Sequence, residues 1–154
     1  RQFAACYCDL NHFKPYNDQY GYWRGDEMIL LLSRVLCAQA QPLRDFVGHV
    51  GGDDFVVLFQ SEDWEQRCIH IIAQFNEAAR ALYDDEARAA GGVQAEDRHG
   101  VQRFHPLTTL SIGAVVVDTR HFAQAEDVAS AAAAAKRRAK KAAQGLHVMR
   151  APAA

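Results

Sequence analysis

The chain has 154 residues, of which 49% are hydrophobic and 23% are charged, so it can bury a core of its own and has the composition of an ordinary globular domain. Its formal net charge of −2 excludes a global positive field that would attract a nucleic acid polymer or an anionic membrane. The sequence contains no apolar stretch of membrane-spanning length and no signal-peptide pattern. We therefore expect one cytoplasmic domain over residues 1–154.

The four cysteines, at positions 6, 8, 37 and 68, show neither a disulfide framework nor the spacing of a zinc site. Cys6 and Cys8 lie on one face of a predicted strand, and no second pair of ligands follows at zinc-finger distance. We expect these cysteines to be reduced, buried thiols, which agrees with a cytoplasmic location.

The first elements in chain order are a strand and two helical segments. An apolar run at residues 3–10 ends on a carboxylate and predicts a buried strand. A short helical turn is expected at 12–19, and apolar residues recur at helical spacing from Trp23 to about Gln41, before Pro42. The chain begins almost inside its first strand, which indicates a domain excised from a larger protein that could itself be anchored in a membrane.

A tight hairpin is expected next. Two apolar strands, 46–50 and 55–59, flank Gly51-Gly52-Asp53-Asp54, and glycine adopts positive φ without steric cost. The remaining predicted elements are a helix at 62–83, a loop or small hairpin arm at 91–105, a strand at 107–117, a helix at about 124–143 and an edge strand at 146–149. This order predicts an α/β (α+β) fold in which helices flank a central, mainly antiparallel sheet.

Three carboxylates are candidates for a metal site. Asp9 ends the first strand, and Asp53 and Asp54 occupy the tip of the hairpin. If the two strands are neighbours, these like charges meet at one edge of the sheet, which is unfavourable unless a cation lies between them. Magnesium commonly uses one or two carboxylates together with phosphate oxygens and water. The pattern favours a metal-bound nucleotide triphosphate, with a solvated acidic turn as the alternative.

Several short motifs occur in a fixed order along the chain. They are Asp9-Leu10-Asn11-His12-Phe13-Lys14, Asn17-Asp18, Gly21, Gly25-Asp26, Gly51-Gly52-Asp53-Asp54-Phe55, Thr109-Leu110-Ser111-Ile112-Gly113 and Ala139-Lys140. Together they resemble the GGDEF domains of diguanylate cyclases, with GGDDF as a variant signature, from Phe3 to about Met149. The resemblance implies a nucleotidyl-cyclase, palm-like fold and a bacterial signalling enzyme that condenses two GTP into cyclic di-GMP and pyrophosphate.

The same resemblance assigns roles to the acidic residues. Asp9, the backbone carbonyl of Leu10 and Asp53 would hold two Mg²⁺ ions, with Mn²⁺ as an alternative. Asp54 would assist the metals or help to deprotonate the attacking 3′-hydroxyl group. Asp53 and Asp54 are therefore the expected catalytic residues.

Six further positions would bind GTP: His12, Phe13, Lys14, Asn17, Asp26 and Lys140. By the resemblance, the backbone N–H groups of the first two cradle the triphosphate, and the two lysines neutralise its charge. The asparagine and Asp26 would read the guanine edge, because a carboxylate can accept from both N1–H and N2–H of guanine.

The product requires two copies of the chain. One domain holds one GTP, whereas cyclic di-GMP joins two guanylate units through two reciprocal attacks. A homodimer with two-fold symmetry, which need form only transiently, would bring two such sites face to face.

Some positions depart from the family pattern. Asp54 replaces the usual Glu and shortens the reach of this side chain by one methylene group. Asn11 replaces an Asp near the expected metals, Tyr22 a His, and Gln144 an Arg. Pro42-Leu43-Arg44-Asp45 stands where the family has an inhibitory R-x-x-D motif, and its first Arg is missing. We therefore expect no feedback through that distal site, and product inhibition by competition in the GTP pocket.

Two alternatives to an active cyclase remain. The first is a catalytically silent GGDEF-like domain that binds GTP or cyclic di-GMP and regulates an attached domain, which the change to Asp54 favours. The second is a purely structural dimerisation module, which the presence of so many nucleotide-binding positions disfavours.

Overall fold

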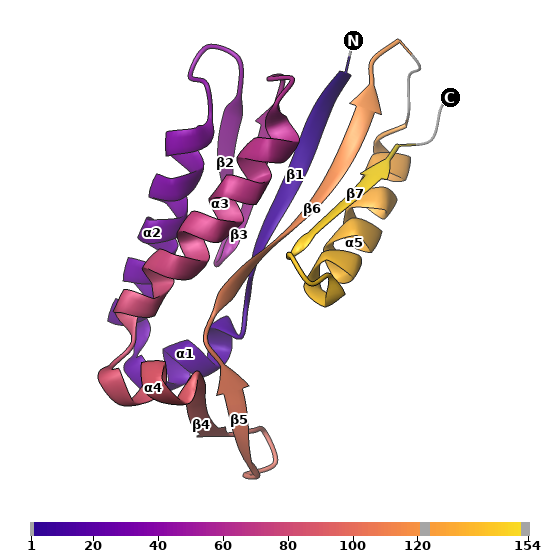
Figure 1. The fold of residues 1–154 in the computed structure, drawn as a ribbon. Coiled ribbons are helices and arrows are strands. Elements are labelled where there is room, and N and C mark those ends of the chain that lie inside the picture. Colours follow the sequence, from indigo (N-terminus) through magenta and orange to yellow (C-terminus); the bar gives the residue numbers. More distant parts are fainter. Residues whose placement is uncertain (1, 121–123, 152–154) are drawn as a thin grey trace.

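A computed structural model describes residues 2–120 and 124–151 of the chain. Its main sheet has five strands in the order β2-β3-β1-β6-β7, and Figure 1 shows the helices around it. The strands are β1 (Gln2–Asn11), β2 (Phe46–Gly51), β3 (Asp54–Phe59), β6 (Thr109–Asp118) and β7 (Leu146–Arg150). The neighbouring strands pair antiparallel except β6 and β7, which are parallel. The prediction of a mainly antiparallel sheet flanked by helices is confirmed.

Helices cover the two faces of this sheet differently. α2 (Tyr22–Gln39) and α3 (Trp64–Ala79) pack on one face, and α5 (Ala125–Lys141) packs on the other beside β6 and β7 (Figure 1). Because side chains alternate along a strand, β1 contributes to both layers. Cys6 and Cys8 join the core under α2 and α3, whereas Phe3 and Tyr7 pack with the alanine-rich face of α5.

The shorter elements gather at one end of the molecule (Figure 1). They are α1 (Phe13–Tyr20), η1 (Arg80–Leu82), α4 (Asp85–Ala90), β4 (Gly92–Glu96) and β5 (Gln102–Pro106). β4 and β5 form an antiparallel pair, so the segment expected as a loop or small hairpin arm is a hairpin. The helix predicted over 62–83 instead ends at Ala79 and is followed by η1.

The cysteines are free, as expected, but they are not all buried. Cys6, Cys8 and Cys68 are buried, whereas Cys37 is exposed. The Sγ atoms of Cys6 and Cys68 lie 3.7 Å apart, and this contact together with burial raises the pKa of Cys6. Trp23 is 80% exposed in this single chain.

None of the helices within residues 2–120 and 124–151 combines the length and the apolar character that a membrane crossing requires.

Candidate active site

The pairing of β1 with β3 brings three acidic side chains together. Cys8 of β1 lies opposite Phe55 of β3, so the next residue of β1 reaches the tip of the β2–β3 hairpin. One carboxylate oxygen from each of Asp9, Asp53 and Asp54 lies within 4.8 Å of the others. We call these three residues the acidic cluster. All three are half-buried, so their mutual repulsion is screened less than it would be on an open surface.

The backbone of the hairpin tip holds two of these acids in place. Gly52 has φ 53°, a left-handed conformation that glycine adopts without steric cost. The register between β2 and β3 shifts between His49 and Gly51. The His49 ring stacks on Phe55 at 4.4 Å between ring centroids, and its Nε2 lies 2.8 Å from the Gly52 carbonyl oxygen. These contacts order the turn that presents Asp53 and Asp54.

The acidic cluster is electrostatically strained in the absence of a cation. Burial, followed by the nearby charge of Asp9, raises the pKa of Asp53. Two lysines of α5 partly compensate. Lys140 Nζ lies 2.9 Å from Asp9 Oδ2, and Lys136 Nζ lies 3.7 Å from Asp54 Oδ1. A hard divalent ion with carboxylate ligands fits this donor set and would relieve the same repulsion.

Lys136 is a candidate site residue that the sequence analysis did not single out. Lys136 and Lys140 lie in a basic run of α5, are four residues apart, and both reach the acidic cluster. Residues separated by four positions share a helix face. The four-residue spacing of the two lysines is readable in the sequence. It indicates a role in the site only when α5 is known to lie beside β1.

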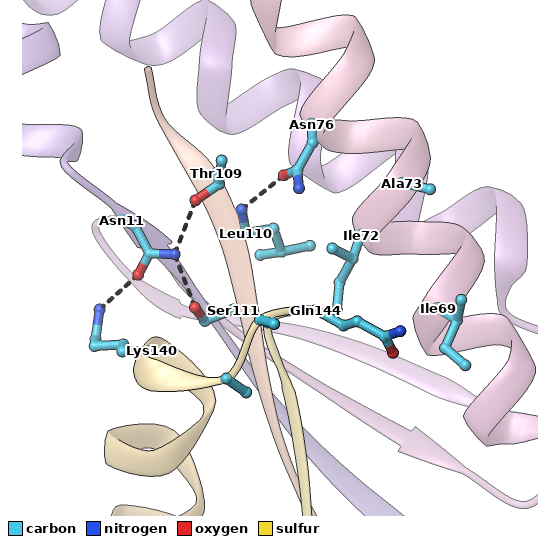
Figure 2. A pocket seen from close by; sticks show the side chains of 13 residues that line it. Asn11, Ile69, Ile72, Ala73, Asn76, Thr109, Leu110, Ser111, Lys140 and Gln144 are labelled. Atoms are coloured by element: carbon cyan, nitrogen blue, oxygen red, sulfur yellow. Dashed lines mark hydrogen bonds between the residues drawn. The ribbon is translucent and has the colours of Figure 1, made fainter. Parts of the chain in front are cut away.

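Asn11 positions Lys140. The amide Nδ2 of Asn11 donates to Thr109 Oγ1 at 3.0 Å and to Ser111 Oγ at 2.8 Å, and its Oδ1 accepts from Lys140 Nζ at 3.2 Å (Figure 2). Lys140 also borders a cavity of about 430 Å³ between α3, β6 and the end of α5. Gln144 is another lining residue of this cavity. Position 11, where the family pattern has an Asp, thus carries an amide that hydrogen-bonds to two residues of β6 and to Lys140.

A second cavity, also of about 430 Å³, lies beside the start of α1, and we call it the α1 cavity. Its lining residues are Leu10, His12, Phe13, Lys14, Pro15, Asn17, Asp18, Tyr22 and Asp53. Asp53 thus belongs both to this cavity and to the acidic cluster. A ligand in the α1 cavity would therefore contact one residue of the acidic cluster directly.

The backbone at the entrance to α1 is suited to an anion. His12 has φ 62° and ψ 30° and directly precedes the helix, whose first residue is Phe13. A left-handed residue followed by right-handed ones directs successive N–H groups into one concavity, and a helix N-terminus adds a positive dipole end. Burial, followed by the positive charges of His105 and Lys140, lowers the pKa of His12, so the backbone rather than the imidazole supplies the attraction.

The remaining predicted site residues differ in how closely they approach this cavity. Asn17 is half-buried and lines it, and its Oδ1 is a buried atom without a hydrogen-bond partner among the described residues. Lys14 lines the cavity with a side chain that is 84% exposed and pairs with Asp18 at 2.7 Å. Asp26 is exposed on α2 and does not line the cavity.

The fold and the site together define a class: an α/β domain in which the β2–β3 hairpin at one edge of the sheet presents carboxylates beside a helix N-terminus suited to an anion. The family model described as "Diguanylate cyclase, GGDEF domain" matches residues 1–145. The chain therefore belongs to the GGDEF domain family, and its expected kinship with diguanylate cyclases and cyclic di-GMP signalling is confirmed.

Curated relatives agree with this assignment. The probable diguanylate cyclase DgcT of Escherichia coli (strain K12) is 28% identical over 114 residues, which cover 74% of this chain and 22% of that protein. A diguanylate cyclase of Vibrio cholerae is 30% identical over 78 residues, covering 50% of this chain and 24% of that protein. The chain thus spans a quarter or less of the length of these relatives.

Solved structures share the fold. The GGDEF domain of DgcB from Caulobacter crescentus, in complex with c-di-GMP, superposes with a TM-score of 0.66 at 20% identity, over 97% of this chain and 78% of that one. The active GGEEF domain of a diguanylate cyclase from Vibrio cholerae gives a TM-score of 0.58 at 18% identity, over 100% and 85% of the two chains. The expected GGDEF fold is confirmed by these likenesses.

Proposed function

We propose that this chain is an active diguanylate cyclase that condenses two molecules of GTP into cyclic di-GMP and pyrophosphate. The observation that carries the proposal is the convergence of Asp9, Asp53 and Asp54 within 4.8 Å at the rim of the α1 cavity. A carboxylate cluster beside an anion-binding helix N-terminus is suited to a metal-bound triphosphate.

Asp9, the backbone carbonyl of Leu10 and Asp53 are the proposed ligands of two Mg²⁺ ions, which Mn²⁺ could replace. Bound metal would lower the pKa of the 3′-hydroxyl group and stabilise charge on the α-phosphate. Asp53 supports this assignment, because burial and the neighbouring Asp9 already raise its pKa and so make a cation favourable there. Asp54 is placed to accept the hydroxyl proton or to complete the metal site.

The chain's own groups then bind and orient GTP. The N–H groups of His12 and Phe13 would hold phosphate oxygens in the α1 cavity. Lys14 has an exposed side chain that could leave Asp18 for a phosphate, since exposed ion pairs of this kind are weak. Lys140, which contacts Asp9 and Asn11, would contribute a second positive charge to neutralise the triphosphate.

Guanine selection is assigned to Asn17 and Asp26. Asn17 lines the α1 cavity, and its buried Oδ1 needs a donor. Asp26 is the residue of α2 that follows Gly25, against which the Asn17 side chain packs. An Asp carboxylate can accept from N1–H and N2–H of guanine, a pair of donors that adenine does not offer.

Catalysis needs two copies of the domain. Each α1 cavity holds one nucleotide, and each 3′-hydroxyl must reach the α-phosphate of the other nucleotide. We infer a homodimer with two-fold symmetry in which the two acidic clusters face each other across the two substrates.

A second function, a nucleotide-binding domain without turnover, is favoured by one observation. The short side chain of Asp54 lies 3.7 Å from Lys136 Nζ, and this ion pair holds the carboxylate on the α5 side of the cluster. A domain that binds GTP or cyclic di-GMP without reacting could regulate an attached domain.

One experiment separates the two functions. The purified chain is incubated with GTP and Mg²⁺, alone and fused to a dimeric coiled coil, and cyclic di-GMP and pyrophosphate are quantified. We expect both products in a 1:2 ratio, more of them from the fused dimer, and none from Asp53→Asn. Binding of GTP or cyclic di-GMP with no product from the forced dimer would favour the silent domain, and absence of binding of both nucleotides would contradict both functions.

A further inference from the structure

His12, the left-handed residue that precedes α1, is hydrogen-bonded through its backbone to a polar network in the interior of the domain. His12 is the only residue other than glycine with positive φ in the described ranges. This conformation is sterically unfavourable for a residue with a Cβ atom, so it persists only where its surroundings enforce it. His12 has no side-chain capping bond. The contact that enforces the conformation must therefore come through its backbone.

That contact comes from Thr108, next to the start of β6. The Oγ1 of Thr108 donates to the backbone carbonyl oxygen of His12 at 3.3 Å. The hydroxyl group of Tyr83 donates to Thr108 Oγ1 at 3.0 Å and accepts from the Thr108 N–H at 2.8 Å. Thr108 Oγ1 accepts the proton of the Tyr83 hydroxyl group, so its own proton is free to be donated to the His12 carbonyl oxygen.

The network is buried and anchored to α1 itself. Thr108 is 1% exposed and Tyr83 is 4% exposed, so water does not compete for the two hydrogen bonds between them. The Tyr83 ring packs edge-on against Tyr16 and Tyr20, with ring centroids 4.9 Å and 5.6 Å away. Tyr16 also donates its hydroxyl to the Leu82 carbonyl at 2.9 Å. The segment that carries Tyr83 is thereby fixed to the helix whose N-terminus it supports.

Fixing the His12 carbonyl also fixes the N–H group of Phe13. The two groups belong to one planar trans peptide, in which they point in opposite directions. With the carbonyl bound to Thr108 on the inner side, the Phe13 N–H must face outward, toward the α1 cavity. Rotation of this peptide would withdraw the donor from the cavity.

We propose that Thr108 and Tyr83 are positioning residues, which hold the His12–Phe13 peptide so that its N–H group faces the nucleotide phosphates. The role of this peptide in phosphate binding rests on the proposed function. The positioning of the peptide does not, and it can be measured with no nucleotide present. Neither residue lines the α1 cavity, so both would act through the backbone of His12.

The test compares Thr108→Val, which keeps the shape and removes the hydroxyl, with Thr108→Ser, which keeps the hydroxyl, and with Tyr83→Phe. The probe is a GTP analogue with a non-cleavable α–β bridge, and guanosine serves as the phosphate-free control. We expect Thr108→Val and Tyr83→Phe to raise the Kd of the analogue about five- to tenfold, the loss expected for one buried hydrogen bond. Thr108→Ser should change it less than twofold, and the affinity for guanosine should stay constant in all three.

A double-mutant cycle isolates the mechanism. Glycine adopts the left-handed conformation without the steric cost, so Thr108→Val should weaken analogue binding less than twofold when introduced into His12→Gly. An equal effect in both backgrounds would overturn the proposal, as would an equal loss of guanosine affinity in Thr108→Val.

A measurement without nucleotide keeps the inference separate from the proposed function. The φ angle of His12 is read by NMR from its three-bond HN–Hα coupling and its ¹³C shifts. We expect the left-handed signature in the wild type and in Thr108→Ser, and its partial loss in Thr108→Val. An unchanged signature in Thr108→Val would overturn the proposal. If the wild type binds no analogue, the proposed function fails, and the NMR result alone decides the positioning role.

Discussion

The amide oxygen of Asn17 packs so closely on Gly25 that a Cβ atom at position 25 would lie 1.8 Å from Oδ1. Gly25 lies inside α2 and is buried, where glycine costs roughly 1 kcal/mol relative to alanine. The glycine is therefore explained by the space that Asn17 needs rather than by the stability of the helix.

Replacing this glycine should separate nucleotide binding from stability. In Gly25→Ala, the new methyl group must displace the end of the Asn17 side chain, while α2 gains helix propensity. We expect the Kd for GTP to rise on the order of tenfold, with a free energy of unfolding that is unchanged or up to about 1 kcal/mol higher. Titration calorimetry and urea denaturation would measure the two quantities. Loss of stability with unchanged affinity would contradict this role for Asn17.

The acidic cluster should make the metal-free protein less stable at neutral pH than a variant that lacks one of its charges. The pKa of Asp53 is raised in the folded protein, by burial and then by Asp9, so the folded state binds this proton more tightly than the unfolded state. Stability from this group is present below the unfolded pKa, near 4, and is lost as pH rises through the folded pKa. We expect Asp53→Asn to raise Tm by about 2 °C at pH 7, allowing for screening of a half-exposed group.

The same variant should show no gain at pH 3, where the wild-type carboxyl is protonated in both states. Addition of Mg²⁺ at pH 7 should raise the Tm of the wild type and leave that of Asp53→Asn nearly unchanged. Thermal scans at the two pH values, with EDTA or with Mg²⁺, would check both statements. A lower Tm for Asp53→Asn at pH 7 in EDTA would show that repulsion within the acidic cluster is not the dominant effect.

The sequence was sufficient to predict the acidic cluster because two local signals pointed to it. An apolar strand ending at Asp9 and a glycine hairpin carrying Asp53 are both readable within a few residues. Only their adjacency needed the structure, and the pairing of β1 with β3 supplies it. The parallel pairing of β7 with β6 was not readable, because a five-residue edge strand carries no signal of direction.

The contacts behind the site were not predictable for a different reason. Thr108 and Tyr83 are 25 positions apart and meet only after α4 and the β4–β5 hairpin fold back on α1. α4 itself has six residues, too few for a hydrophobic period, and is recognisable only by its caps. Asp84 accepts from the Ala87 N–H at 2.8 Å, and Gly91 ends the helix with φ 77°.

The length of the side chain at position 54 should limit the rate of the proposed cyclase. Asp54 is held 3.7 Å from Lys136, and a displacement of about 1 Å at a reacting centre can cost on the order of a hundredfold. We expect Asp54→Glu to raise kcat on the order of tenfold with little change in KM, measured as cyclic di-GMP formed by the dimeric fusion. Lys136→Met is the matched variant that frees Asp54 without lengthening it, and a smaller gain is expected there. A fall in kcat in Asp54→Glu would contradict this explanation.

Asp45, which stands where the resemblance places the acid of the inhibitory motif, is already engaged in hydrogen bonds within the domain. Its carboxylate accepts from the N–H groups of Gln41 and Gln60 at 2.8 Å each and from the hydroxyl and N–H of Ser61. Burial alone would raise the pKa of this carboxyl, but the hydrogen bonds outweigh it and lower the pKa. The side chain thus ties the end of β3 to the loop that precedes β2.

This arrangement predicts a structural rather than an inhibitory role for Asp45. Because its folded pKa is depressed, the stability it contributes is present above the unfolded pKa, near 4, and is lost as pH falls through the folded pKa. We expect Asp45→Ala to lower the free energy of unfolding by about 1 kcal/mol at pH 7 and by less at pH 3, as measured with urea. Inhibition by cyclic di-GMP should be competitive with GTP in the wild type and unchanged in this variant. Noncompetitive inhibition that disappears in Asp45→Ala would instead show that a distal product site survives without its arginine.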